Sequence, residues 1–227
     1  MLRLALFDID GTLIRTGGAG VKAFARVFSS EFGVSDGFER LKFAGRTDYS
    51  LVREFFVHHS IPPTPANFRR FFDAYVFWLD QLLSQCEGGI CPGVLEFIAG
   101  LRGLKPRPLI GLLTGNIRLG AEIKLRYYGL WDLFETGAFA DDHEERDCIA
   151  AIARSRGGTL LKQELPGDSV LVVGDTPHDI RCGRSIGART LAVATGGSSL
   201  EELHPHQPDW LVTDLSRVSV SDVAGIA

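Results

Sequence analysis

The chain has 227 residues, 45% of them hydrophobic, which is enough to bury a core in one large domain or in a core domain with a smaller companion. Its 24 basic and 28 acidic residues give a formal charge of −4, which argues against a nucleic-acid partner bound through bulk charge. Four scattered cysteines without a C-x-x-C pair favour neither a zinc site nor a disulfide framework, and we expect reduced, buried thiols at Cys86, Cys91, Cys148 and Cys182.

The apolar run at the N-terminus, Met1 to Phe7, is too short for a signal peptide, and no later stretch reaches the ~18 apolar residues of a membrane span. We therefore expect a cytoplasmic enzyme that binds neither nucleic acid nor membrane. The sequence leaves open whether it is a monomer or a homodimer.

The run Leu4 to Phe7 predicts a buried strand that ends at Asp8. The next interval, from about Ile14 to Cys91, has several helical patterns and no convincing strand, and residues 68–83 carry a dense aromatic face that is typical of a packed helix. Glycine-rich segments flank it, as hinges or as ordinary loops. We predict a helical cap over residues 16–87, inserted into a core of residues 1–15 and 88–227.

Further apolar runs at 109–113, 170–173 and 190–194 each stop at a polar or glycine-rich cluster, which fits strands covered on both faces. Helical patterns at 94–104 and 119–128 alternate with them. The sequence therefore predicts an α/β fold, namely a doubly wound parallel-sheet Rossmann-like core with an inserted α-helical cap.

Polar residues follow the ends of these strands, where the ligands of open parallel sheets bind. Asp8 and Asp10 follow the first strand, Gly11 allows backbone N–H groups to approach an anion, and Thr12 adds a hydroxyl. An Asp-x-Asp-Gly-Thr string alone is also compatible with an Asx turn or a calcium loop. Calcium loops do not usually follow a buried strand, which favours a catalytic pair.

Asp175 and Asp179 place further carboxylates at the end of another strand, so the shared crevice requires a cation. Hard oxygen ligands favour Mg²⁺ over a soft metal. At the third strand end, Thr114, Gly115 and Asn116 supply neutral groups suited to phosphoryl oxygens.

Three strings together resemble the signature motifs of the haloacid-dehalogenase-like hydrolase superfamily: Phe7 to Leu13, Leu113 to Asn116 and Val173 to Asp179. The likeness spans nearly the whole chain and is nearest to the phosphoglycolate-phosphatase-like and β-phosphoglucomutase-like branches. It implies an aspartyl-phosphate mechanism with Mg²⁺ as the cofactor.

By this resemblance, Asp8 attacks phosphorus, and Asp10 protonates the leaving oxygen and later activates water. A carboxylate with a reference pKa of about 3.9 is already ionised at neutral pH and needs no base, whereas an acid must hold a proton for part of the cycle. The resemblance further implies that Thr114 and the backbone of Gly11 hold the transferring oxygens.

The resemblance also implies a metal site formed by the side chains of Asp8 and Asp175 and by the backbone carbonyl of Asp10. Asp179 would support it through water or a contact outside the ligand set. The bound ion would neutralise charge as the phosphoryl group is transferred.

The family usually has a lysine after the second motif, and this chain departs from that pattern. Arg146 is the expected substitute, because a guanidinium contacts a carboxylate and a phosphoryl oxygen at once. Lys124 is the rival, although its place in a helical pattern favours a surface or packing role.

In the cap, the segment Ala44 to Asp48 resembles the loop that reaches the substrate in related enzymes. Arg46 is then a candidate for binding the anionic end of the leaving group, and a solvated helix cap is the alternative. His178 lies within the last motif beside the expected metal, whereas we expect no zinc at the remaining paired histidines: His58, His59, His204 and His206.

The leading functional hypothesis is a phosphatase that acts on a small phosphorylated metabolite. A phosphosugar mutase that uses the same aspartyl-phosphate is the alternative, and a catalytically silent binding module of the same fold is the non-enzyme alternative. A 2-haloacid dehalogenase is disfavoured, since that branch lacks the second aspartate. The sequence does not identify the substrate.

Overall fold

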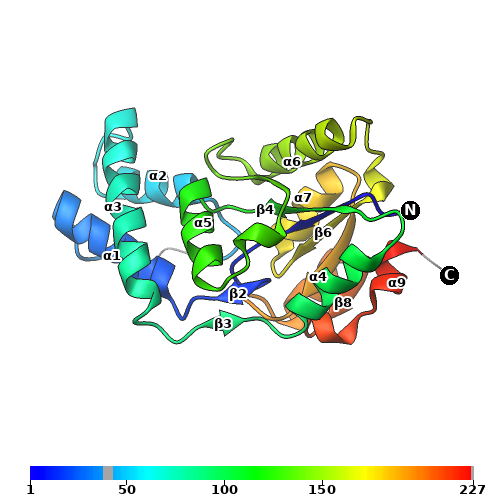
Figure 1. The fold of residues 1–227 in the computed structure, drawn as a ribbon. Helices are drawn as coiled ribbons and strands as arrows, with labels where there is room; N and C mark the ends of the chain where they lie inside the picture. The colour runs from blue at the N-terminus through cyan, green and yellow to red at the C-terminus, as the bar shows by residue number, and fades with distance from the viewer. Residues whose placement is uncertain (38–42, 226–227) are drawn as a thin grey trace.

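A six-stranded sheet, with all strands parallel and in the order β5-β4-β1-β6-β7-β8, forms the centre of the protein (Figure 1). The computed structural model describes residues 1–37 and 43–225, so residues 38–42, which belong to the predicted cap, lie outside the described residues. The strands are β1 (Leu4–Phe7), β4 (Leu109–Leu113), β5 (Thr136–Ala138), β6 (Val170–Gly174), β7 (Arg189–Val193) and β8 (Trp210–Val212).

Helices cover both faces of this sheet, which explains the unbroken apolar runs. In β1, Ala5 and Phe7 belong to one hydrophobic cluster and Leu4 and Leu6 to another on the opposite face. The first cluster is covered by α4 (Val94–Gly103), α5 (Arg118–Tyr127) and α9 (Val220–Ala224), and the second by α6 (Arg146–Leu161) and α7 (Pro177–Ser185). The predicted α/β fold class is confirmed.

Four strands of the structure were not expected from the sequence. The edge strands β5 and β8 have three residues each and are only partly buried, so they lack a long apolar run. The two-residue strands β2 (Ile14–Arg15) and β3 (Gly89–Ile90) pair antiparallel where the chain crosses between core and cap. The prediction of no strand between Ile14 and Cys91 is therefore wrong at both ends of that interval.

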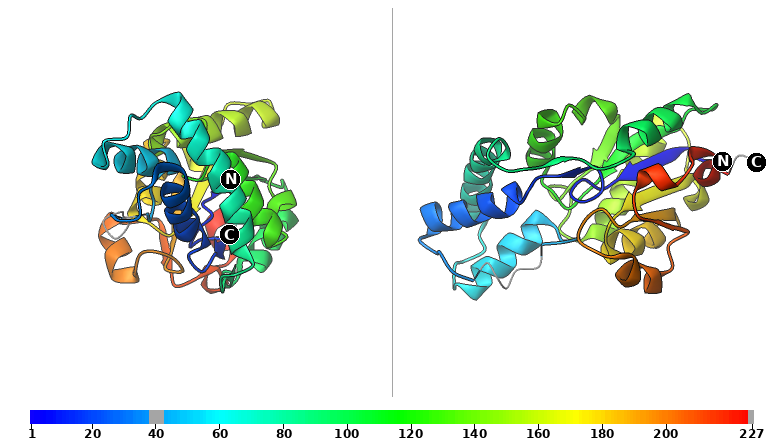
Figure 2. Two further views of the ribbon diagram at one scale, coloured as in Figure 1. Left: turned by 90° about the vertical axis from the view of Figure 1, so that its left-hand side faces the viewer. Right: turned by 90° about the horizontal axis from the view of Figure 1, so that it is seen from below.

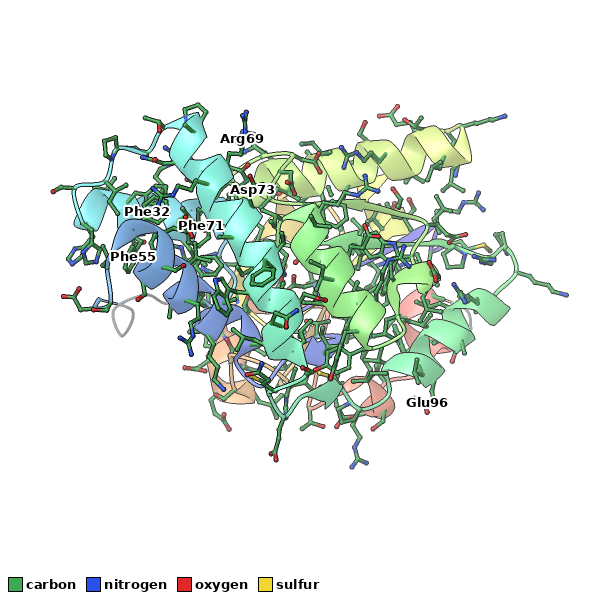
Figure 3. All side chains as sticks on the ribbon, turned by 60° about the vertical axis from the view of Figure 1, so that its left-hand side comes forward. Phe32, Phe55, Arg69, Phe71, Asp73 and Glu96 are labelled. Atoms are coloured by element: carbon green, nitrogen blue, oxygen red, sulfur yellow. The ribbon has the colours of Figure 1, made fainter. Side chains whose placement is uncertain are left out.

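The cap consists of α1 (Ala19–Phe32), α2 (Asp48–His58) and α3 (Pro65–Leu83), which lie together at one end of the core (Figures 1 and 2). They share a hydrophobic cluster of their own, in which aromatic side chains from all three helices meet. Phe32, Phe55 and Phe71 gather between these helices (Figure 3). The aromatic face predicted for α3 is packed as expected, except that Phe77 is exposed.

The two crossings between core and cap run close together. A Cβ at Gly17 would lie 2.1 Å from the Glu87 carbonyl oxygen, and one at Gly88 would lie 2.2 Å from that of Arg15. Glycine is needed here because the two backbones nearly touch. We propose that this pair of crossings is the boundary between a core of 1–15 and 88–227 and a cap of 16–87.

The cap rests on the core through α3 and α5, and the cap cluster includes Ile117 and Ala140 of the core. Met1 and α9 lie at the opposite end of the core (Figures 1 and 2). Among the described helices, none combines the length and apolar character that crossing a bilayer requires.

All four cysteines are free thiols, as expected. Their predicted burial is correct for Cys91 and Cys182, whereas Cys86 is half-buried and Cys148 is exposed.

Candidate active site

Asp8 and Asp10 lie directly beyond the carboxyl end of β1, at the centre of the sheet. The backbone N–H of Asp8 donates to the carbonyl of Val173, which fixes the loop against β6 at 2.9 Å. Asp8 is buried, whereas the Asp10 side chain is 42% exposed. Both residues line one cavity between the core and the cap.

Gly11 and Thr12 shape the turn after the two aspartates. Gly11 has a φ of +85°, and a Cβ there would lie 2.4 Å from Oδ2 of Asp175, so the turn requires glycine. Its N–H donates to the Ile14 carbonyl at 2.8 Å and is already paired. Thr12 is fully buried and donates its hydroxyl to Oδ1 of Asp175 at 3.2 Å. Thr12 therefore positions a carboxylate.

Asp8, Asp175 and Asp179 form a buried acidic cluster in which oxygen atoms from all three lie within 4.8 Å of one another. Burial raises the pKa of Asp8 to about 6, although the Arg146 guanidinium lowers it. Burial and the neighbouring Asp179 and Asp8 raise the pKa of Asp175 well above its ordinary value. The cluster therefore holds more negative charge than the nearby cation offsets.

This donor set fits Mg²⁺, because it consists of hard carboxylate oxygens at one point and carries uncompensated negative charge. Asp175 accepts one hydrogen bond on each oxygen, from the Thr12 hydroxyl and from the Gly197 N–H. Asp179 is more heavily engaged, since Oδ2 accepts from the N–H and hydroxyl of Thr176 at the start of α7, and Oδ1 contacts Arg146.

Arg146, the first residue of α6, reaches the acidic cluster with a side chain that is 4% exposed. One of its terminal nitrogens lies 3.1 Å from Oδ1 of Asp8 and also contacts Asp179. The other lies 3.5 Å from the carbonyl of Gly45 in the cap. Arg146 therefore joins the candidate nucleophile, the acidic cluster and the cap.

Lys124 belongs to the same site, which corrects the surface or packing role expected for it. Its side chain is 5% exposed, and Nζ lies 2.6 Å from Oδ2 of Asp10 and 2.6 Å from Oδ1 of Asn116. Asn116 in turn donates its amide to Asp10 at 2.8 Å and to the Thr114 hydroxyl at 2.9 Å. Among the cations that line the cavity, Arg146 therefore lies beside Asp8 and Lys124 beside Asp10.

The loop after β4 also docks the cap. The carbonyl of Gly115 accepts the N–H of Asp48 at 2.7 Å, and a Cβ at Gly115 would lie 2.1 Å from the Arg46 carbonyl oxygen. The Asp48 carboxylate accepts the N–H of Ile117 at 2.8 Å, at the start of α5. A glycine is required here because the two backbones pass so closely.

Arg46 lines the cavity from the loop before α2, but its guanidinium pairs with Glu54 of α2 at 2.5 Å. His178 lies beside the neighbouring Gly45, where a Cβ would meet its ring at 2.5 Å. Burial lowers the pKa of His178, which favours the neutral ring. Its ring therefore packs against the cap loop, outside the residues that line the cavity.

The cavity between core and cap has a volume of about 520 Å³, within the range of small-molecule sites. Its walls contain Asp8, Asp10, Thr114, Arg146 and Asp175, which sequence patterns had indicated. They also contain Arg15, Asp48 and Tyr75, which no motif had marked as site residues. Asp48 lies two positions after Arg46, at the end of the segment Ala44 to Asp48 that resembles a substrate-binding loop. This position was its only signal in the sequence.

Comparison with known proteins matches residues 5–193 to the model of the family described as haloacid dehalogenase-like hydrolase. The probable phosphatase IndB of Dickeya dadantii is 26% identical over 226 residues, covering 96% of this chain and 92% of that protein. The pyrophosphatase PpaX of Bacillus cereus is 25% identical over 221 residues, covering 95% of this chain and 94% of that protein.

Solved structures share the fold along the whole chain. CbbY from Rhodobacter sphaeroides, solved in complex with xylulose 1,5-bisphosphate, has a TM-score of 0.76 at 20% identity and covers 96% of each chain. A predicted phosphoglycolate phosphatase from Haemophilus somnus has a TM-score of 0.73 at 18% identity, covering 100% of this chain and 98% of that one. At these identities the likeness concerns the fold alone.

Proposed function

This chain belongs to the haloacid dehalogenase-like hydrolase family, and on that premise we propose that it is a Mg²⁺-dependent phosphatase acting on a small phosphorylated metabolite. The observation that carries the proposal is the pair of carboxylates on one cavity wall with different partners. Asp8 lies against Arg146 in the acidic cluster, whereas Asp10 is held by Lys124 and Asn116. Two carboxylates in distinct environments suit a nucleophile and an acid–base group.

In the first step, a carboxylate oxygen of Asp8 attacks phosphorus and forms an aspartyl-phosphate. The bond from phosphorus to the leaving oxygen breaks, and Asp10 gives that oxygen its proton. Lys124 and Asn116 both contact Oδ2 of Asp10, so they position this carboxyl group toward the cavity. The alcohol then leaves.

In the second step, water attacks the phosphorus of the aspartyl-phosphate. Asp10, now a carboxylate, accepts the proton of that water, and the bond from phosphorus to the Asp8 oxygen breaks to release inorganic phosphate. The donors proposed for the phosphoryl oxygens are the Thr114 hydroxyl and Arg146, and both line the cavity. Because Gly11 has no side chain, its loop can lie close to Asp175.

Mg²⁺, when bound, would neutralise charge on the carboxylates and the phosphoryl group. Asp8 and Asp175 would hold it, together with the backbone carbonyl of Asp10. Asp179 supports this arrangement from outside by orienting Arg146, which it contacts.

The test is phosphate release from 4-nitrophenyl phosphate and a panel of metabolite phosphates, including 2-phosphoglycolate and pyrophosphate, with Mg²⁺ and with EDTA. We expect Mg²⁺-dependent release that Asp8→Asn abolishes while the circular dichroism spectrum stays unchanged. Asp168→Asn is the matched control, since Asp168 is exposed and lies outside the cavity. Comparable activity of Asp8→Asn, or activity that survives EDTA, contradicts the mechanism.

The same panel distinguishes hydrolysis from transfer of the phosphoryl group back to the substrate. A hexose 1-phosphate that is converted into its isomer without free phosphate would identify a phosphosugar mutase. Absence of turnover on every phosphate would favour a catalytically silent binding module.

A further inference from the structure

The loop of residues 139–145 joins β5 to α6 and leads to Arg146, the first residue of that helix. Contacts with the core hold this loop. Asp142 accepts a backbone N–H of the loop at 2.9 Å, and its carboxylate binds two nitrogens of Arg156 in α6 at 2.6 and 2.7 Å. Another N–H of the loop donates to the Asn116 carbonyl at 2.9 Å. The position of Arg146 therefore depends on how this loop is held.

The cap also holds this loop, through contacts with Glu144. The Glu144 carbonyl accepts the hydroxyl of Thr47, the residue before α2, at 2.8 Å. The two oxygens of the Glu144 carboxylate accept Nε of Arg53 in α2 at 2.9 and 3.0 Å, and Nη2 of Arg53 lies 2.9 Å from Oε2. The backbone and the side chain of one core residue therefore both bind the cap.

Arg53 is also oriented by a neighbour within the cap. Its guanidinium carbon lies 5.0 Å from the centre of the Phe68 ring in α3, which is the geometry of a cation–π contact. The hydrogen bond to Glu144 raises the pKa of Arg53, as a favourable ion pair does. Isolated surface ion pairs contribute little, but a bidentate pair whose arginine is stacked on a ring loses less side-chain freedom when it forms. The pair can therefore hold the cap against the loop.

The same junction includes Arg146 itself. One terminal nitrogen of Arg146 lies 3.5 Å from the carbonyl of Gly45, in the cap segment that also binds Glu144. The other terminal nitrogen lies 3.1 Å from Oδ1 of Asp8. The cap is thus bound to the core at Glu144 and, two residues later, at Arg146. Separation of cap and loop would release the guanidinium that contacts the proposed nucleophile.

We propose that Glu144 is a positioning residue that acts through Arg146. Its ion pair with Arg53 holds the cap against the loop before α6, and Arg146 consequently stays beside Asp8. This inference rests on the proposed phosphatase function. Neither Glu144 nor Arg53 lines the cavity, so neither contacts the substrate. Without their ion pair, a smaller fraction of the molecules has Arg146 in place, and kcat falls in proportion.

Two single substitutions test the ion pair, since Glu144→Gln and Arg53→Gln each remove one of its charges. We expect each to lower kcat for 4-nitrophenyl phosphate about two- to fivefold with little change in Tm. The double variant should lose no more than either single one, because both act on the same contact. Glu145→Gln and Arg69→Gln are the matched controls and should keep the wild-type kcat, because both residues are exposed and lie outside the cavity.

Two further measurements distinguish positioning from a purely structural effect. In the Arg146→Lys background, Glu144→Gln should leave kcat unchanged, because the geometry that Glu144 maintains is already lost. Raising the salt concentration from about 0.1 M to about 1 M should lower kcat of the wild type relative to that of Glu144→Gln. The Debye length falls from roughly 10 Å to roughly 3 Å over this range, which weakens an exposed ion pair.

The outcomes separate this inference from the proposed function. A wild-type kcat in both Glu144→Gln and Arg53→Gln overturns the inference and leaves the phosphatase standing. The same fold loss from Glu144→Gln in the wild type and in the Arg146→Lys background also overturns it, because Glu144 then does not act through Arg146. No phosphate release from any ester by the wild type overturns both proposals.

Discussion

Nζ of Lys124 lies 2.6 Å from Oδ2 of Asp10, so a buried cation in the middle of α5 holds the carboxylate that we propose as the acid–base group. Arg146 makes the equivalent contact to Asp8 from the start of α6. The two proposed catalytic aspartates are thus served by separate cations on separate helices. The contribution of each cation can therefore be tested by its own substitution.

Replacing Lys124 by methionine keeps an unbranched side chain one atom shorter but removes the donor that positions Asp10. Because acid–base catalysis contributes roughly 10²- to 10⁴-fold, we expect kcat to fall by about 10²-fold with a smaller change in KM. Steady-state kinetics on 4-nitrophenyl phosphate measures this. Lys105→Met, at an exposed position outside the cavity, should retain wild-type values. A normal kcat for Lys124→Met would remove Lys124 from the mechanism.

Replacing Arg146 by lysine keeps the charge but not the fork that reaches Asp8, Asp179 and Gly45 together. An ammonium on a shorter, non-planar head does not reproduce that geometry. We expect kcat to fall roughly 10²-fold, as when one preorganised donor to a transition state is lost. Arg154→Lys is the control on the same helix, since Arg154 binds only the backbone carbonyls of Leu165 and Ile186. Equal losses in both variants would point to damage to α6 instead.

Magnesium should stabilise the folded protein by relieving repulsion between Asp8 and Asp175. A ligand that binds only the folded state at 100 times its Kd adds about 2.7 kcal/mol, and each kcal/mol raises the Tm of a chain of this size by roughly 2–4 °C. Differential scanning fluorimetry in millimolar MgCl₂ against EDTA checks this. The shift should disappear in Asp175→Asn and persist in Asp168→Asn. A full shift in Asp175→Asn would place the ion elsewhere.

Asp48 should make the stability of the protein depend on pH. Burial raises its pKa to about 7, and the nearby Asp10 and Asp141 add to the shift, while Lys124 and the Ile117 N–H oppose it. The folded state therefore favours the protonated form. The contribution of Asp48 to stability is full below its ordinary pKa of about 3.9, falls as the pH rises toward 7, and stays low above it.

Asp48→Asn removes this penalty and retains an oxygen that can accept the Ile117 N–H. We expect the variant to melt above the wild type at about pH 8, by an amount on the order of a few kcal/mol in unfolding free energy, and to match it near pH 4. Thermal unfolding of both proteins across this range, in EDTA, gives the comparison. A difference that is the same at both pH values would mean that the carboxylate charge is not responsible.

The residues that follow the buried strands could be read from the sequence because their signals are local. The run Leu4 to Phe7 and the immediately following Asp8 and Asp10 leave little freedom in where the strand ends. The edge strands β5 and β8 could not be predicted in the same way. They are short and half-exposed, and pairing with a neighbour, rather than their own composition, makes them strands.

The choice between Arg146 and Lys124 could not be made from spacing. Both side chains are long, and both reach the cavity from helices whose directions are set by packing on the sheet. The sequence placed Lys124 on a helix correctly, but which face of that helix meets Asp10 depends on how α5 lies beside β4 and the cap.

The sequence by itself determined the four central strands of the sheet, the inserted helices and the order of acidic residues at the strand ends, because apolar runs and turn residues act over a few neighbours. Tertiary structure alone decided that Asp48 and Tyr75 face the same cavity as Asp8, although they come from three separate elements. Their proximity depends on the docking of the cap on the core, through contacts such as the Asp48 N–H to the Gly115 carbonyl. Such contacts join residues far apart in the chain, and no local pattern records them.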